Sequence, residues 1–304
     1  MKTRISLPLA VLCLVSYTIA LPIANRDVTH LTRLIVFGDS FSDNGNGSWV
    51  VSNATWPSDP SYFAHSFSDG PVWNERVANA LGLELVNIAT GGATTNNGFV
   101  QGRTGPKSEI PVPSTAEQIA SFLSWDEPRP RDVFVHWSGV NEILFNPNVT
   151  GSQTTSLINQ NIEILYRAGA RNIILGNYND IETFPGTYNI SDYESDNVKS
   201  YMDDLSIGLR NVVGAYSAYA NTALVEAQTL FRNIAANPTE YRIDEKYVHP
   251  PTACLQGAYG SQGRSLCSDP EHHLFFDSYH PVKEVHAAIG KLVEDKIRAF
   301  DSQR

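Results

Sequence analysis

Residues 34–43 read LIVFGDSFSD, a run of four apolar residues that leads into a Gly-Asp-Ser turn. A short apolar run closed by a glycine is typical of a strand buried on both faces of a parallel sheet. Folds of this kind place their chemistry at the carboxyl ends of the strands. Ser40 therefore lies where a nucleophile is expected, although Gly, Asp and Ser are also ordinary turn residues.

Apolar runs and helical periodicity alternate along the rest of the chain. Further apolar runs predict strands at 83–89, 132–137, 172–176 and 223–226. Helices are predicted at 72–81, after the capping box at 114–117, at 154–168, from a cap at Ser191 or Asp192 to about 219, and after Pro281. Residues 257–268 are predicted to form a loop. The alternation implies an α/β domain with a parallel sheet of about five strands, covered on both faces.

The first residues of this 304-residue chain have the layout of a secretory signal peptide: a basic start, an apolar run and a small-residue end. We expect cleavage after Ala20, or alternatively after Ala24, so that residues 1–20 are removed and 21–304 form a single domain. No stretch is long and apolar enough to predict a membrane span. The net charge of −10 argues against nucleic acid as a partner. We expect a secreted, extracellular monomer.

Cys254 and Cys267 remain after the signal segment is removed, and an even pair in an exported protein predicts a disulfide. These two sulfurs alone are too few for a metal site. Four Asn-X-Ser/Thr sequons are candidate N-glycosylation sites: Asn46, Asn53, Asn148 and Asn189. Asn46 is the weakest candidate because it lies close to the expected catalytic site.

The ends of the predicted strands bring chemically useful residues to one edge of the sheet. Ser40 follows the first strand, Gly92 the second and Asn141 the third. The backbone N–H groups of Ser40 and Gly92 and the side-chain amide of Asn141 would form an oxyanion hole. The alternative for Gly92 is a glycine that is needed only for a tight turn.

Asp277 and His280 complete this arrangement just before the last predicted helix. A carboxylate three residues before an imidazole can reach back to it. Asp277 would then hold Nδ1 of His280 and leave Nε2 free to take the Ser40 proton. This is the orienting acid, base and nucleophile of acyl-transfer enzymes, and it requires neither a cofactor nor a metal ion.

Four sequence blocks resemble those of the GDSL, or SGNH, hydrolase superfamily: GDSFSD at 38–43, GGAT at 91–94, GVNE at 139–142 and DSYHP at 277–281. The chain is similar to secreted fungal esterases of this family, including carbohydrate acetylesterases. The resemblance implies a three-layer α/β/α sandwich with a flavodoxin-like layout, together with the same triad and oxyanion hole. Glu142 replaces the family's usual Asp, which leaves open how Asn141 is oriented.

We therefore expect a serine ester hydrolase that removes short acyl groups, acetyl above all, from carbohydrate or small-molecule esters. A lipase or phospholipase that acts on longer acyl chains is the first alternative. A catalytically silent module that binds sugars or cell walls is the second, although no triad residue is missing.

The loop at 44–71 is long for a plain connection, so we expect it to form a wall of the cleft. Its aromatic residues either contact substrate or pack the loop onto the domain: Trp49, Trp56, Tyr62 and Phe63. Trp137 either lines the pocket or packs in the core.

Several titratable residues have simpler explanations than catalysis. Asp39 and Asp43 are expected to brace the turn around Ser40. His136 is expected in the core, and His286 on the solvated face of the last helix. One group lacks enough ligands for a metal and is expected at the surface: Glu271, His272 and His273.

Overall fold

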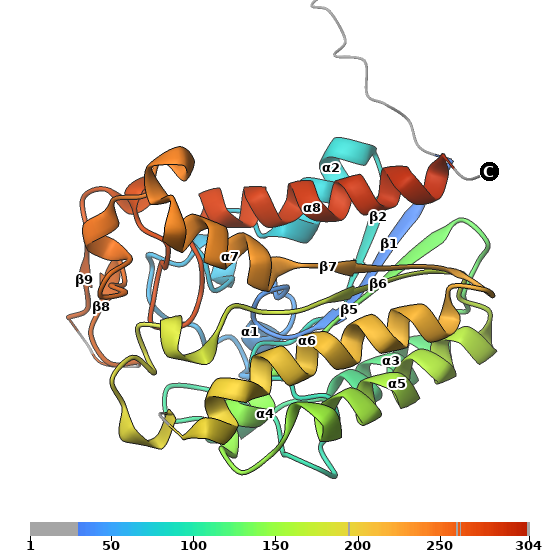
Figure 1. Ribbon diagram of the computed structural model, residues 1–304, viewed down its shortest axis with the longest axis horizontal. Helices are drawn as coiled ribbons and strands as arrows, with labels where there is room; N and C mark the ends of the chain where they lie inside the picture. Colours follow the sequence, from blue (N-terminus) through green and yellow to red (C-terminus); the bar gives the residue numbers. More distant parts are fainter. Residues whose placement is uncertain (1–29, 194, 260, 262, 303–304) are drawn as a thin grey trace, which may run out of the picture.

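The computed structural model describes residues 30–193, 195–259, 261 and 263–302 (Figure 1). Within these ranges, five parallel strands form the central sheet in the order β2-β1-β5-β6-β7. Their bounds are β1 Arg33–Gly38, β2 Glu84–Asn87, β5 Asp132–Trp137, β6 Asn172–Gly176 and β7 Asn221–Val225. The predicted parallel sheet and its flavodoxin-like order are confirmed. The predicted signal peptide lies outside the described residues.

Helices cover both faces of this sheet, as Figure 1 shows. Helices α2 and α8 pack together on one face, while α3, α5 and α6 lie on the other. Their bounds are α2 Trp73–Leu81, α3 Thr115–Trp125, α5 Gly151–Ala168, α6 Asp196–Tyr216 and α8 Lys283–Asp301. The arrangement is the three-layer α/β/α sandwich that the resemblance implied.

The sequence signals that start and stop these elements act as expected. Every residue of β1, β5 and β6 is buried, because their apolar runs face helices on both sides. The Ser114 hydroxyl accepts from the Glu117 N–H, and the Glu117 carboxylate accepts in return from the Ser114 N–H. Gly82 ends α2 in the left-handed conformation, with φ of 67°.

The shorter elements were mostly not predicted. They comprise the helices α1 Ser48–Val51, α4 Val140–Phe145 and α7 Ala227–Ala236, and the paired strands β3 Arg103–Thr104 with β4 Ile110–Pro111 and β8 Leu255–Gln256 with β9 Ser265–Leu266. Short 3₁₀ turns span Phe63–His65, Ile181–Thr183, Ser191–Tyr193, Pro238–Tyr241, Glu245–Tyr247 and Pro270–His272.

Two boundary predictions are wrong. The cap of α6 is Ser195, whose hydroxyl accepts from the Val198 N–H, whereas residues 191–193 form a separate 3₁₀ turn. The segment 257–268 is not all loop, because residues 265–266 pair with residues 255–256 in a small antiparallel ladder.

None of the helices in the described ranges combines the length and apolar character needed to cross a bilayer.

Candidate active site

The carboxyl edge of the sheet opens onto a pocket of about 390 Å³. Ser40, Gly92, Asn141 and His280 all line this pocket, although they come from four separate segments of the chain. Asp277 lies behind His280 and is fully buried. The structure therefore brings the five predicted site residues together.

Ser40 lies in a tight turn that directly follows β1. The N–H groups of Ser42 and Asp43 donate to the Asp39 carbonyl at 3.0 and 2.9 Å, which closes the turn. The Asp39 carboxylate accepts from the Phe41 N–H at 3.0 Å, so its predicted bracing role is confirmed. Within the described ranges, neither the N–H nor the hydroxyl of Ser40 has a hydrogen-bond partner. Both groups remain available to a bound molecule.

Asp39 also belongs to a buried network that the sequence analysis missed. Its carboxylate accepts from the Tyr178 hydroxyl at 2.6 Å and lies 3.4 Å from the Asn141 amide nitrogen. Burial raises the pKa of Asp39 to about 7, against the opposing hydrogen bonds from Tyr178 and the Phe41 N–H. Tyr178 follows β6 at the same sheet edge, so its position relative to the strand end was the available signal.

Asp43, the last residue of the GDSFSD block, holds the backbone next to Gly92. The Asp43 carboxylate accepts from the N–H groups of Ser48 at 2.7 Å and Gly91 at 2.8 Å. Gly92 itself has a left-handed φ of 83°, and an added Cβ would overlap the Arg103 carbonyl oxygen. The turn and its close neighbour thus require glycine here, which both interpretations of Gly92 allow. The Gly92 N–H has no hydrogen-bond partner among the described residues.

Asn141 lies in α4, and its amide nitrogen donates to the Ala93 carbonyl at 2.9 Å. Glu142 does not orient this amide. Its buried carboxylate instead accepts from the Thr95 N–H, and burial raises its pKa. Asn141 therefore takes its orientation from Ala93 and Asp39, and Glu142 anchors the segment that follows Gly92.

His280 and Asp277 form a close pair. Nδ1 of His280 lies 2.8 and 2.9 Å from the two carboxylate oxygens of Asp277. Burial alone would raise the pKa of Asp277, but His280, the Tyr279 N–H and the Tyr62 hydroxyl outweigh it and lower the pKa to about 2. Asp277 is therefore ionised at neutral pH. Among the described residues, Nε2 of His280 has no hydrogen-bond partner, and the ring packs on Phe67 with centroids 4.8 Å apart.

Two histidines that were predicted to be exposed are buried. His286 is buried against Phe41, not solvated, because it lies on the inward face of α8 beside Val285 and Ile289. Burial lowers its pKa to about 3. His273 is buried as well and stacks on Tyr247 with ring centroids 3.5 Å apart.

The other structural interpretations can now be assigned. His136 is a core residue, as predicted, with Nε2 3.0 Å from the Thr115 hydroxyl, and burial lowers its pKa to about 4. Trp137 packs in the core against Trp73. Of the aromatic residues named in the loop at 44–71, Trp56 lines the pocket.

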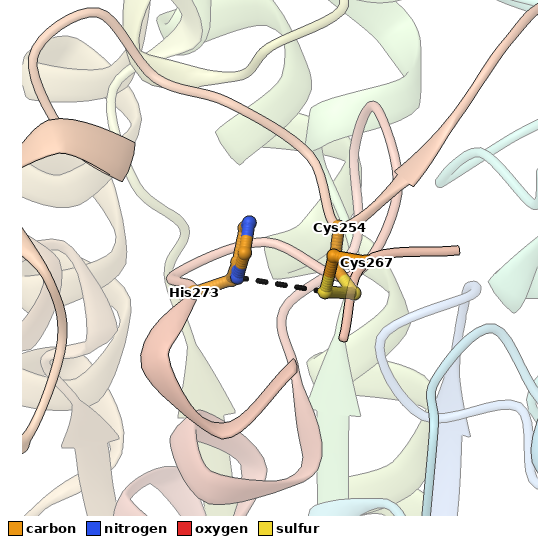
Figure 2. A group of neighbouring side chains, drawn as sticks. All are labelled: Cys254, Cys267 and His273. Carbon is orange, nitrogen blue, oxygen red and sulfur yellow. Dashed lines mark hydrogen bonds between the residues drawn. A yellow bond between two sulfur atoms is a disulfide. The ribbon is translucent and has the colours of Figure 1, made fainter. Parts of the chain in front are cut away.

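Cys254 and Cys267 are joined in a disulfide, as predicted (Figure 2). Nδ1 of His273 lies 3.7 Å from the sulfur of Cys267. This trio resembles a metal site only by its composition, because both sulfurs are already bonded to each other. The four sequon asparagines are all exposed: Asn46, Asn53, Asn148 and Asn189.

Comparison with known proteins identifies related chains. The family model described as GDSL-like Lipase/Acylhydrolase matches residues 34–293. A phosphatidylcholine-sterol acyltransferase of Aeromonas hydrophila is 25% identical over 86% of this chain and 88% of its own length. An acetylesterase of Thermothelomyces thermophilus is 26% identical over 91% of each chain.

A solved structure shares the fold. It is a carbohydrate esterase family 2 enzyme with a carbohydrate binding domain, from Corynascus thermopiles (Myceliophthora fergusii). The TM-score is 0.50 at 15% identity, over 88% of this chain and 66% of that chain. At this identity the similarity supports the fold alone.

Proposed function

This chain belongs to the GDSL-like lipase/acylhydrolase family and is a carboxylic ester hydrolase, and we propose that it acts through a Ser40–His280–Asp277 triad. One observation carries the proposal. A hydroxyl, an imidazole and amide donors from four distant segments line one pocket, and the imidazole is held from behind by a buried carboxylate at 2.8 Å.

The reaction has two half-steps. The Ser40 oxygen attacks the ester carbonyl carbon while its proton passes to Nε2 of His280. The tetrahedral adduct collapses, the carbon–oxygen bond to the alcohol breaks, and His280 returns the proton to the leaving alcohol. Water then attacks the acyl group on Ser40 by the same route and releases the acid.

The oxyanion of each adduct needs donors that are not already committed. The N–H groups of Ser40 and Gly92 meet this condition in the described ranges. One hydrogen of the Asn141 amide is committed to Ala93 at 2.9 Å, whereas the other faces Asp39 across 3.4 Å. That distance is long for a hydrogen bond, so the second N–H is the weakly engaged donor of the amide and the one that we propose for the oxyanion.

We propose acetylated carbohydrates as the preferred substrates. Aromatic rings surround the triad in the pocket and can stack on the apolar faces of sugar rings: Trp56, Phe67, Tyr193, Tyr259 and Tyr279. A second candidate, hydrolysis of longer acyl esters, is favoured by an apolar part of the same wall: Val140, Leu144, Phe145 and Phe184.

A substrate panel separates these candidates. Purified protein is assayed for acid release from acetylated sugars and from esters of increasing acyl length, with Ser40→Ala as the control for triad-dependent turnover. Fastest turnover of acetyl sugars supports the first candidate, and activity confined to long chains refutes it. A folded protein that is inert towards every ester would instead favour the silent binding module.

We also propose that the protein is secreted and glycosylated. The signal-like start of the sequence, the predicted disulfide pair and the exposure of the four sequon asparagines support this. Mass spectrometry of the protein from its native culture medium measures both the start of the mature chain and the occupied asparagines. A chain that is retained in the cells refutes secretion.

A further inference from the structure

Around Asp277 lies a group of side chains whose hydroxyl and guanidinium groups have no role in the proposed reaction. The Tyr62 hydroxyl donates to one oxygen of the Asp277 carboxylate at 2.7 Å, and the Tyr259 hydroxyl donates to the same oxygen at 2.8 Å. The Tyr259 oxygen also lies 3.1 Å from Nδ1 of His280. Tyr62 comes from the loop after α1, and Tyr259 from the segment between β8 and β9. Two distant loops therefore converge on one carboxylate oxygen.

Arg264 holds these two phenols in place. Its guanidinium donates to the Tyr62 hydroxyl at 2.9 Å, and its central carbon lies 5.2 Å from the centroid of the Tyr259 ring. Both contacts are typical of an arginine that orders aromatic partners. The other Asp277 oxygen is satisfied by the N–H groups of Tyr279 and His280, each at 2.8 Å.

We infer that Tyr62 and Tyr259, ordered by Arg264, are positioning residues that fix the Asp277 carboxylate against His280. They thereby set the acid limb, the pH range in which activity falls on the acid side of the pH–activity profile. This inference rests on the proposed triad. It goes beyond the triad because neither phenol takes part in proton transfer from Ser40.

The physical basis is competition for the charge on Asp277. Burial raises the pKa of both phenols well above the ordinary value, so each keeps its proton and acts as a donor. Each donated hydrogen bond draws negative charge away from the imidazole side of the carboxylate. Without one phenol, the carboxylate stabilises a protonated imidazole more strongly, and protonated His280 cannot accept the Ser40 proton.

Other titratable groups also face the Asp277–His280 pair, and the test variants must leave them unchanged. The groups that interact with Asp277 or His280 are Asp39, Tyr62, Tyr259, Arg264, Tyr279 and His286. Of these, the two phenols bond directly to the Asp277 carboxylate. Because the Tyr259 oxygen also contacts Nδ1 of His280, Tyr62→Phe is the variant that changes the charge distribution of the carboxylate alone.

The disulfide links this cluster to the backbone beside Asp277. Tyr259 and Arg264 both lie in the segment that the Cys254–Cys267 bond closes. The same segment is anchored to the strand-like residues before Asp277, since the Cys254 N–H donates to the Phe275 carbonyl at 3.1 Å. Opening the disulfide should therefore loosen Tyr259 and Arg264 directly, and Tyr62 only through its hydrogen bond with Arg264.

The test compares Tyr62→Phe and Tyr259→Phe with Tyr247→Phe, a matched control. The Tyr247 hydroxyl bonds to Asp269, another carboxylate in the same part of the chain, and does not line the pocket. We expect each of the first two variants to lose about tenfold in kcat/KM. Their acid limbs should move to higher pH by about half a pH unit, while the control matches the wild type.

Two results would overturn the inference. One is an unchanged acid limb in both variants, whether or not activity falls, because a merely structural role lowers activity without moving the limb. The other is wild-type kcat/KM in both variants. If Ser40→Ala retains wild-type turnover, the proposed triad fails instead, which distinguishes the two failures. Thermal unfolding checks that the variants fold, and the partly exposed Tyr259 provides the test if Tyr62→Phe does not fold.

A double-variant comparison tests the link to the disulfide. Tyr259→Phe is combined with Cys254→Ser and Cys267→Ser. If the disulfide acts by holding Tyr259, removing the hydroxyl in the disulfide-free background costs less than threefold, compared with about tenfold in the intact protein. A full tenfold loss in both backgrounds refutes this link.

Discussion

Replacing Asp39 by asparagine should change how the stability of this hydrolase depends on pH. Asp39 is fully buried, and burial raises its pKa from 3.8 to about 7. Between these values the folded protein keeps the Asp39 proton while the unfolded chain has lost it. The unfolded state thus binds fewer protons, so the free energy of unfolding falls as the pH rises through this window.

The size of the effect follows from the width of the window. About three pH units, at about 1.4 kcal/mol for each, give about 4 kcal/mol of stability that the wild type loses between pH 4 and 7. Asp39→Asn cannot ionise and should not show this loss. Its stability relative to the wild type should therefore rise by about 4 kcal/mol across the same range.

Urea unfolding at intervals between pH 4 and 8, extrapolated to water, measures this difference. Titrations of groups that do not interact with Asp39 occur in both proteins and cancel in the comparison. The charges of Glu142 and His280 act on Asp39, so the pKa values of these two groups differ between the two proteins and add a smaller contribution of their own. Asp192→Asn, at an exposed site, is the control for the loss of one carboxylate. The reasoning would be contradicted if the difference in the free energy of unfolding between Asp39→Asn and the wild type varied by less than about 1 kcal/mol between pH 4 and 8.

Three further predictions concern the site itself. Asn141→Ala should lower kcat by about 10²–10³, as loss of one oxyanion donor does, whereas Asn148→Ala at an exposed sequon should not; steady-state kinetics of both variants measures this. Gly92→Ala should destabilise the protein by about 1–3 kcal/mol, because its φ of 83° disfavours a side chain and the Arg103 carbonyl blocks one; a thermal midpoint equal to wild type would contradict this. Asp277→Asn should reduce kcat by about 10⁴. The depressed pKa of Asp277 gives the wild type about 2 kcal/mol of stability, which is present above pH 3.8 and lost as the pH falls to about 2. Asp277→Asn should lack this contribution, and acid unfolding curves of both proteins test this.

The sheet was predictable because its strands carry their own signal. The runs around Ile35 and Ile174 are continuously apolar and that around Val135 is followed by His136, a pattern typical of strands covered on both faces. The start of α6 was less predictable, because Ser191, Asp192 and Ser195 are all good caps and the packing of the chain chooses among them. His286 was misplaced because a histidine was assigned to the polar face by residue type, although its spacing from Ile289 and Val293 puts it on the apolar face of the helix.

The site residues at the ends of strands and helices were predictable, whereas those in irregular loops were not. Ser40, Gly92, Asn141 and His280 each follow a strand or precede a helix, so the topology alone brings them to one pocket. Tyr62 and Tyr259 come from irregular loops, whose paths depend on side-chain packing and on the disulfide. No local pattern marks them, and only the folded chain reveals that they share a carboxylate.

Two buried carboxylates near one imidazole have opposite protonation tendencies, and this contrast supports the proposed assignment of roles. Asp277 receives donors from His280, two backbone N–H groups and two phenols, and its pKa falls to about 2. Asp39 receives fewer donors, chiefly from Tyr178 and the Phe41 N–H, and burial raises its pKa to about 7. An orienting acid must stay ionised while the imidazole gains and loses a proton. Asp277 meets that requirement across the working pH range of a histidine base, and the adjacent Asp39, although next to the nucleophile in sequence, does not.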